Sequence, residues 1–169
     1  MTGTPTSSPF WTFSLRFYRL DGVAPACLAL QDEQGVDVNV LLFLLFVATQ
    51  GRSLTQADVA AIDVAMAGWR RETVAPLRAV RRVLRTPPAA IDAAQAEALR
   101  ERIKAVELEA ERLEQEALFA LRPMAAWGQA GDAAAAAGHV AAYAAHLGAS
   151  FPPAPVQVLL DRLASLATT

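Results

Sequence analysis

Residues 30–48 read LQDEQGVDVNVLLFLLFVA, and the stretch passes at Val40 from polar residues into nine unbroken apolar ones. Asp37 comes shortly before this run, and its carboxylate can accept hydrogen bonds from the free N–H groups of a first helical turn. The pattern therefore predicts a helix over about residues 38–50, ended by Gly51. Because apolar residues surround its whole circumference, we expect this helix to be the central, buried element.

Composition limits the classes of protein that fit the chain. Its 169 residues carry a formal net charge of −2, so no global field directs the protein to nucleic acid or to an anionic membrane. The apolar run is shorter than the roughly 20 residues of a membrane-spanning helix, and the first residues do not resemble a signal peptide. We therefore predict a cytoplasmic protein. Cys27 is the single cysteine and lies among apolar neighbours, so it is expected in the core.

The remaining periodicities are helical, and no segment alternates with period two as a half-buried strand does. The predicted class is therefore all-α. A first helix is predicted to start at Ser8 and Pro9 and to turn its phenylalanines inward. Trp11 and Tyr18 lie on a second face, which is a candidate contact patch. A short helix over about residues 23–33 follows and ends before Gly35.

Residues 55–121 predict a long helical hairpin. After a cap at Thr55, apolar residues recur at spacings of three and four, and Pro76 predicts a kink or break near residues 71–75. The second half, from about residue 89, predicts a core stripe in the same spacing, made of Leu99, Ile103, Val106, Ala110, Leu113 and Ala117.

These elements predict a single-domain helical bundle around the central helix of residues 38–50, with the hairpin of residues 55–121 and a C-terminal helical tail. We expect residues 1–122 to form a helical core domain. Residues 123–169 are rich in alanine and are expected to form helices that pack on this domain.

The strongest indication of function is the segment WRRETVAPLRAVRRVLR, residues 69–85, which holds six arginines and one glutamate. Projected at about 100° per residue, the arginines share one flank of the helix. They are Arg70, Arg71, Arg78, Arg81, Arg82 and Arg85. The planar guanidinium suits carboxylate and phosphate groups, so this flank predicts an acidic protein partner or, as an alternative, RNA or another phosphate-bearing ligand. Equally, the seven glutamates between Glu97 and Glu116 could pair with the arginines inside the hairpin.

A second candidate site lies at the start of the central helix. Gln31, Asp37 and Asn39, together with Trp69, either cap helices or form the polar end of a pocket beside the central helix. If these residues form a pocket, the protein is expected to handle an apolar ligand or a cofactor.

No constellation specifies a reaction, so we predict no catalytic residue, no metal site and no particular cofactor, and we favour a non-catalytic interaction or regulatory protein. The aspartate pairs near apolar helices are five residues apart, a spacing that does not stack on one helical face. His139 and His146 are seven apart, and no cysteine or carboxylate stands at ligand spacing beside them. Phosphate-binding glycine loops are absent from the sequence as well.

Three segments, FWTFSLRFY, ACLALQDEQGVDVNVLLFLLF and WRRETVAPLRAVRRVLR, carry a resemblance to a bacterial family of small helical proteins of unknown function. The resemblance covers about residues 9–121. The residues at the positions of its pattern are Trp11, Leu30, Gln31, Asp37, Asn39, Leu42, Trp69 and Arg78. It implies a helical, cytoplasmic domain and no known activity, and the sequence leaves the partner's identity and the oligomeric state open.

Overall fold

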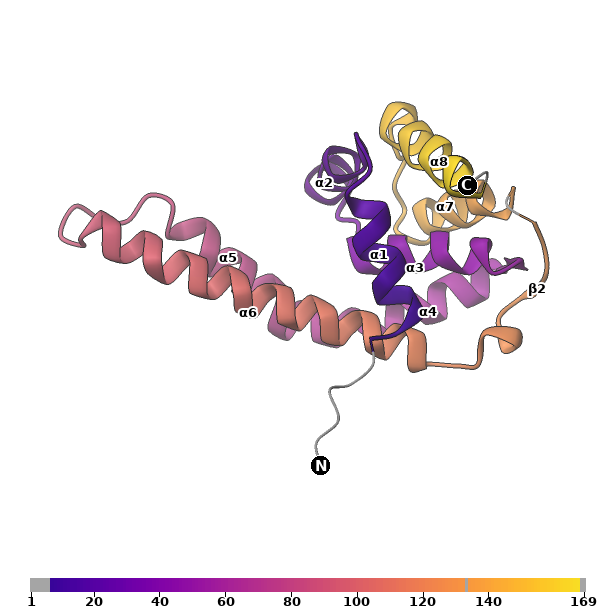
Figure 1. Cartoon of the computed structure of the whole chain (residues 1–169), viewed down its shortest axis with the longest axis horizontal. Helices are drawn as coiled ribbons and strands as arrows, with labels where there is room; N and C mark the ends of the chain where they lie inside the picture. The colour runs from indigo at the N-terminus through magenta and orange to yellow at the C-terminus, as the bar shows by residue number, and fades with distance from the viewer. Residues whose placement is uncertain (1–6, 133, 168–169) are drawn as a thin grey trace.

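Helices make up most of the computed structural model, which describes residues 7–132 and 134–167, and the predicted all-α class is confirmed (Figure 1). The helices are α1 (Pro9–Tyr18), α2 (Val23–Gln34), α3 (Val38–Thr49), α4 (Gln56–Trp69), α5 (Ala75–Val83), α6 (Ala93–Ala120), α7 (Ala135–His146) and α8 (Pro153–Ala167). A π-helical turn, η1 (Arg70–Val74), joins α4 to α5, and a 3-10 turn, η2 (Met124–Ala126), follows α6.

The apolar helix α3 is the centre of the bundle, as its sequence predicts. Every residue from Asn39 to Ala48 is buried, and α3 contacts α1, α2, α4, α6 and α7. Asp37 caps the helix, because its Oδ1 accepts hydrogen bonds from the backbone N–H groups of Asn39 at 2.9 Å and Val40 at 3.3 Å.

The predicted helix ends agree closely with the structure where a capping residue marks them. Ser8 Oγ accepts a hydrogen bond from the Trp11 N–H at 3.1 Å at the start of α1. Thr55 and Asp58 form a reciprocal capping box at the start of α4. The helix α2 ends at Gly35, whose φ of 68° lies in the left-handed region that glycine adopts without strain.

Pro76 breaks the first half of the hairpin where its chemistry predicts. Proline has no N–H to donate to the carbonyl of Glu72, and the backbone responds with the five-residue turn η1, in which the Ala75 N–H bonds to the Arg70 carbonyl. A π-helical turn changes the rotation per residue. Side chains on either side of it therefore no longer follow the regular 100° projection.

The hairpin extends beyond the rest of the molecule (Figure 1). We call residues 75–109, which comprise α5, the connecting loop and the first part of α6, the arm, and the helices grouped around α3 the body. The prediction that the second hairpin helix starts near residue 89 is wrong. It starts at Ala93, because Asp92 Oδ1 accepts a hydrogen bond from the Gln95 N–H at 2.8 Å and caps it.

The predicted core stripe of α6 is also wrong in part. Leu99, Val106 and Leu113 are 42%, 52% and 44% exposed. The buried residues of this helix are Ala96, Glu107, Ala110, Glu114, Gln115 and Leu118. In the arm α6 packs mainly on α5, so the helix is covered on one side, and its rotation brings glutamates to the arginines of the hairpin.

A short sheet that the sequence does not predict joins the two halves of the chain. Strand β1 (Arg52–Ser53) pairs antiparallel with β2 (Gln129–Ala130). A Cβ at Gly128 would lie 2.0 Å from the Ser53 carbonyl oxygen, so only glycine lets the two backbones approach this closely. Strands of two residues carry no periodicity, which is why the pattern misses them.

The C-terminal helices pack on the rest of the body. The helix α7 contacts α3 and α4, and α8 contacts α2. Trp127, Tyr143 and Leu159 are buried in the same apolar cluster as Phe10 and Phe43. Among the described residues, no helix is both long and apolar enough to cross a membrane.

Candidate functional site

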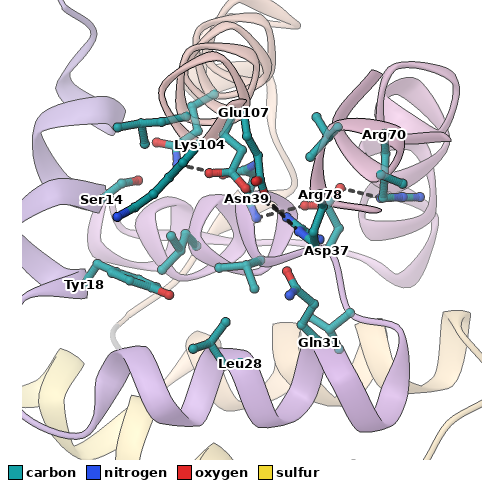
Figure 2. A pocket seen from close by; sticks show the side chains of 18 of the residues that line it. Ser14, Tyr18, Leu28, Gln31, Asp37, Asn39, Arg70, Arg78, Lys104 and Glu107 are labelled. Atoms are coloured by element: carbon teal, nitrogen blue, oxygen red, sulfur yellow. Dashed lines mark hydrogen bonds and ion pairs between the residues drawn. The ribbon is translucent and has the colours of Figure 1, made fainter. Parts of the chain in front are cut away.

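A cavity of about 980 Å³ lies between helices α1 to α3 on one side and the hairpin on the other. Figure 2 shows side chains from these elements around it, including Tyr18 of α1, Leu28 and Gln31 of α2, and Arg78 of α5. This volume falls in the range of cavities that hold small molecules.

One wall of the cavity is apolar and aromatic. Trp11, Leu15 and Tyr18 line it from α1, and Leu28 from α2 lies 46% exposed within it. The side of α1 that packs on the core explains where its cavity residues lie. Phe10 and Phe17 are fully buried against the core, so the opposite side of α1 faces the cavity.

The wall contributed by the hairpin is charged. Arg78 Nε lies 3.1 Å from Glu107 Oε1 and its Nη2 lies 2.8 Å from Glu111 Oε1, and Arg81 also binds Glu107. Burial alone would raise the pKa of Glu107, but hydrogen bonds from Arg81 and Arg78 lower it below its ordinary value. Arg78 and Arg81 therefore pair with glutamates inside the hairpin, which is one of the alternatives that the sequence leaves open.

Cations outnumber carboxylates around the cavity. Arg82 reaches Asp32 of α2 at 2.8 Å, with both side chains more than half exposed. Within the described residues, Arg19 and Arg85 make no ion pair, although both line the cavity. The lining contains seven arginine or lysine side chains against four carboxylates, so an anionic group is favoured there.

A network of buried polar groups joins the start of α3 to α4 and α7. Arg70 Nη1 lies 2.6 Å from Asp37 Oδ2 and 2.9 Å from Asp63 Oδ1. Tyr143 accepts a hydrogen bond from the Asp37 N–H at 3.2 Å and donates one to Asp63 at 3.1 Å, and His146 Nε2 lies 3.0 Å from Asp63 Oδ2. Burial alone would lower the pKa of Arg70, but hydrogen bonds to Asp37 and Asp63 raise it, which keeps the guanidinium charged.

A second set of polar contacts fixes Asn39. Its Nδ2 donates to Glu114 Oε2 at 2.9 Å, and its Oδ1 accepts from Gln115 Nε2 at 2.8 Å. Burial and the negative charge of Asp37 raise the pKa of Glu114 to about 9, so this carboxyl group is neutral at neutral pH. Ser14 Oγ and Gln115 Oε1 are buried and have no hydrogen-bond partner among the described residues, and both side chains line the cavity.

The structure brings most of the sequence-predicted site residues to one place. Those that line the cavity are Trp11, Tyr18, Gln31, Asp37, Asn39, Arg70, Arg78, Arg81, Arg82 and Arg85. The two groups that the sequence treats as separate sites, the arginine flank and the start of the central helix, therefore share one cavity.

Two predicted residues lie elsewhere. The projection that placed Arg71 on the arginine flank is wrong: its side chain is 71% exposed and pairs with Glu72, because η1 interrupts the regular helical rotation. Trp69 does not line the cavity either. Its Nε1 donates to the Ala110 carbonyl at 3.0 Å and ties α4 to α6.

Several residues of the site escape sequence reasoning. Asp63, Tyr143 and His146 meet Asp37 and Arg70 only through the packing of α7 on α4, and no local pattern links them. The prediction from the sequence does not distinguish Glu107 and Glu114 from the other glutamates of this helix. Their spacing of seven, with Ala110 between them, is the one signal that could have placed both on the buried side.

The two histidines of α7 have separate partners. His139 Nε2 accepts a hydrogen bond from the Leu54 N–H at 2.8 Å, and its Nδ1 lies 2.9 Å from the Leu44 carbonyl. Burial lowers the pKa of His139, so the ring is neutral and structural. In the parts of the chain that the structure describes, no group of histidine, cysteine, aspartate or glutamate side chains is arranged to hold a metal ion. Burial also raises the pKa of Cys27 to about 12, as expected for a core thiol.

Comparison with known proteins identifies a family. A family model described as a protein of unknown function (DUF2390) matches residues 9–118, which confirms the resemblance inferred from the three sequence segments and its approximate extent. No curated protein and no solved structure matches the chain.

Proposed function

The chain belongs to the DUF2390 family, and we propose that it is a non-catalytic binding protein whose cavity takes a small amphipathic molecule with an acidic group. The observation that carries this proposal is the cavity of about 980 Å³ in which an apolar wall faces a cationic one. An apolar portion of the ligand would lie against Trp11, Leu15 and Leu28, and its acidic group would face the arginines of the hairpin.

The charges of the cavity support an acidic ligand more than a neutral one. Arg78 and Arg81 have their guanidinium groups engaged by Glu107, whereas no carboxylate among the described residues lies within ion-pair distance of Arg85, which has only a longer-range attraction to Glu97. A ligand carboxylate or phosphate can therefore bind Arg85 without displacing an internal ion pair. The buried, unpaired atoms of Ser14 and Gln115 would gain partners if side-chain rotation brought them to a polar ligand group.

Isothermal titration calorimetry with decanoate and with decanol tests the proposal. We expect decanoate to bind more tightly than decanol, because the two share a chain length and differ in charge. Leu28→Asp should weaken binding of both probes, because it places a charge on the apolar wall of the cavity. Arg85→Glu should weaken decanoate about tenfold and leave decanol unchanged, since one favourable charge becomes a repulsive one.

Arg71→Glu is the matched control, because Arg71 belongs to the same helical segment but lies outside the cavity. It should bind decanoate like the unaltered protein. Absence of binding to either probe, together with no small molecule seen by native mass spectrometry of the gently purified protein, would rule the proposal out. Equal losses in the Arg71 and Arg85 variants would also contradict it.

An acidic protein partner is the second candidate. The observation in its favour is the row of cations along the hairpin edge of the cavity, where Arg82, Arg85 and Lys104 are all exposed. A fluorescent glutamate-rich peptide measured by anisotropy should bind if this candidate is right, and its binding should weaken in the double variant Arg78→Glu/Arg82→Glu. RNA binding with a steep salt dependence would instead favour the nucleic-acid alternative.

The other sequence predictions stay predictions. These are the division into residues 1–122 and 123–169, bacterial origin and cytoplasmic location.

A further inference from the structure

The helix α6 has an apolar side that faces away from the cavity. Leu99, Val106 and Leu113 follow each other at intervals of seven along α6 and are 42%, 52% and 44% exposed. Trp69 lies beside this row, because its indole N–H donates a hydrogen bond to the carbonyl of Ala110, between Val106 and Leu113. The Trp69 residue is 38% exposed. We call these four residues the back face. Single exposed apolar residues are common on proteins, but apolar residues repeated every seven positions share one side of a helix, where another helix can pack on them.

The cavity lies on another side of the same helix. Leu108, which is 54% exposed, lines the cavity together with Lys104 and Glu111. Val106 and Leu108 are two positions apart in the chain, and this spacing, a rotation of about 200°, places their side chains on nearly opposite sides of α6. A molecule bound to the back face would therefore leave the cavity open.

The charged residues beside the back face indicate which partner helix, and in which direction, can pack on it. Arg102 and Glu109 each follow a back-face residue by three positions, so both lie on the same flank of the seam. Both are exposed. Among the described residues no carboxylate lies within ion-pair distance of Arg102, whereas Glu109 pairs with Arg112 of its own helix, with 2.7 Å between Oε1 and Nη2. If two α6 helices pack antiparallel with Val106 at the centre, Arg102 of each lies opposite Glu109 of the other. In a parallel two-fold pair, this flank of one helix would lie on the opposite side of the seam from the same flank of the other helix, so Arg102 and Glu109 would not meet.

The shape of the arm permits this pairing. Figure 1 shows α5 and the first part of α6 projecting from the body, and α5, whose residues are all described, has no buried side chain. Two molecules packed along their back faces would bring their two α6 helices side by side.

We propose that the back face binds a second copy of this chain, with the two arms antiparallel about a two-fold axis near Val106. The contact is self-complementary, as a two-fold axis requires. This dimer does not depend on the proposed ligand, because the cavity faces away from it.

Sedimentation velocity of the full chain over a wide range of concentrations tests the dimer. We expect a monomer–dimer equilibrium in the unaltered protein and a monomer at all concentrations for Val106→Glu, with the helical circular dichroism unchanged. Leu108→Glu is the matched control, since it places the same charge at an equally exposed position of the same helix, and it should remain dimeric.

A charge exchange tests the antiparallel register. Arg102→Glu and Glu109→Arg should each weaken dimerisation about tenfold, because each change affects two symmetry-related pairs, and the double variant should restore it. A monomeric unaltered protein, a dimeric Val106→Glu variant, a monomeric Leu108→Glu variant, or a double variant as weak as the single ones would each overturn the proposal.

Discussion

The body and the arm are built from similar amphipathic helices, yet different interactions hold them together. In the body, α3 is covered on all sides, and every residue from Val40 to Ala48 is buried. In the arm, α5 has no buried side chain, all its residues being described, and its contacts with α6 include the ion pairs of Arg78 and Arg81 with Glu107. The same three-and-four spacing therefore marks a core stripe only where neighbouring helices cover the whole stripe.

The largest expected effect lies in the body. Phe43 is fully buried, and its ring contacts Phe10 with 5.1 Å between centroids and Trp127 with 6.3 Å. Phe43→Ala should lower the free energy of unfolding by about 3–5 kcal/mol, through lost burial and the cavity left behind. In the arm, Leu99→Ala should cost less than about 1 kcal/mol, because Leu99 is 42% exposed. Urea denaturation of both variants checks the comparison, and similar costs would contradict it.

The next effect concerns the buried charges at the point where the body meets the hairpin. Arg70→Met would leave the Asp37 and Asp63 side chains, which are 5% and 8% exposed, without their cation. We expect a loss of about 3 kcal/mol in the free energy of unfolding, since an unpaired buried charge is strongly unfavourable. Arg71→Met serves as the control on the next residue and should change the free energy by less than about 0.5 kcal/mol. A cost for Arg70→Met as small as that of the control would show that water screens the two carboxylates.

A pH dependence should follow from Glu114. Its pKa is raised from the ordinary 4.5 to about 9, so between these values the folded protein keeps a proton that the unfolded chain releases. The free energy of unfolding should therefore fall as the pH rises through this window. Glu114→Gln removes the titrating group, and its unfolding free energy should fall less steeply over the same range. Parallel curves for the two proteins in urea titrations at several pH values would contradict the assignment.

The smallest effect is expected for the exposed contact between the arm and α2. Arg82 and Asp32 lie 2.8 Å apart, but their side chains are 53% and 55% exposed. A double-mutant cycle with alanine at both positions should give a coupling of about 0.2–1 kcal/mol that disappears at high salt. A larger, salt-resistant coupling would mean that this pair fastens the arm to the body more firmly than its exposure indicates.

Local sequence chemistry predicted the fold well where a single residue type decides the backbone. The start of α3, the start of α4 and the break at η1 could each be predicted. Each depends on one side chain that acts on the nearest turn, namely Asp37, Thr55 and Pro76 respectively. The predicted start of α6 near residue 89 is too early, because Asp92 caps the helix and it begins at Ala93. The two-residue strands β1 and β2 were missed because their pairing depends on distant glycines.

The residues of the candidate site could be predicted from the sequence, but their convergence on one cavity could not. The chemistry of the arginines and of the start of α3 pointed to binding groups, but only the docking of the hairpin on helices α1 to α3 made one cavity of them. Asp63, Tyr143 and His146 joined the polar network through contacts between segments more than 70 residues apart. No spacing along the chain encodes such contacts.

By itself, the sequence determined an all-α chain with a fully apolar central helix, capped by Asp37, and a hairpin broken at Pro76, because these features arise from side chains acting within one or two turns. Only the tertiary structure decided which side of the hairpin is covered. That choice depends on which helices have neighbours, and it buried Glu107 and Glu114 while leaving Leu99, Val106 and Leu113 exposed. It also turned two separate groups of residues into one cavity with an apolar and a cationic wall.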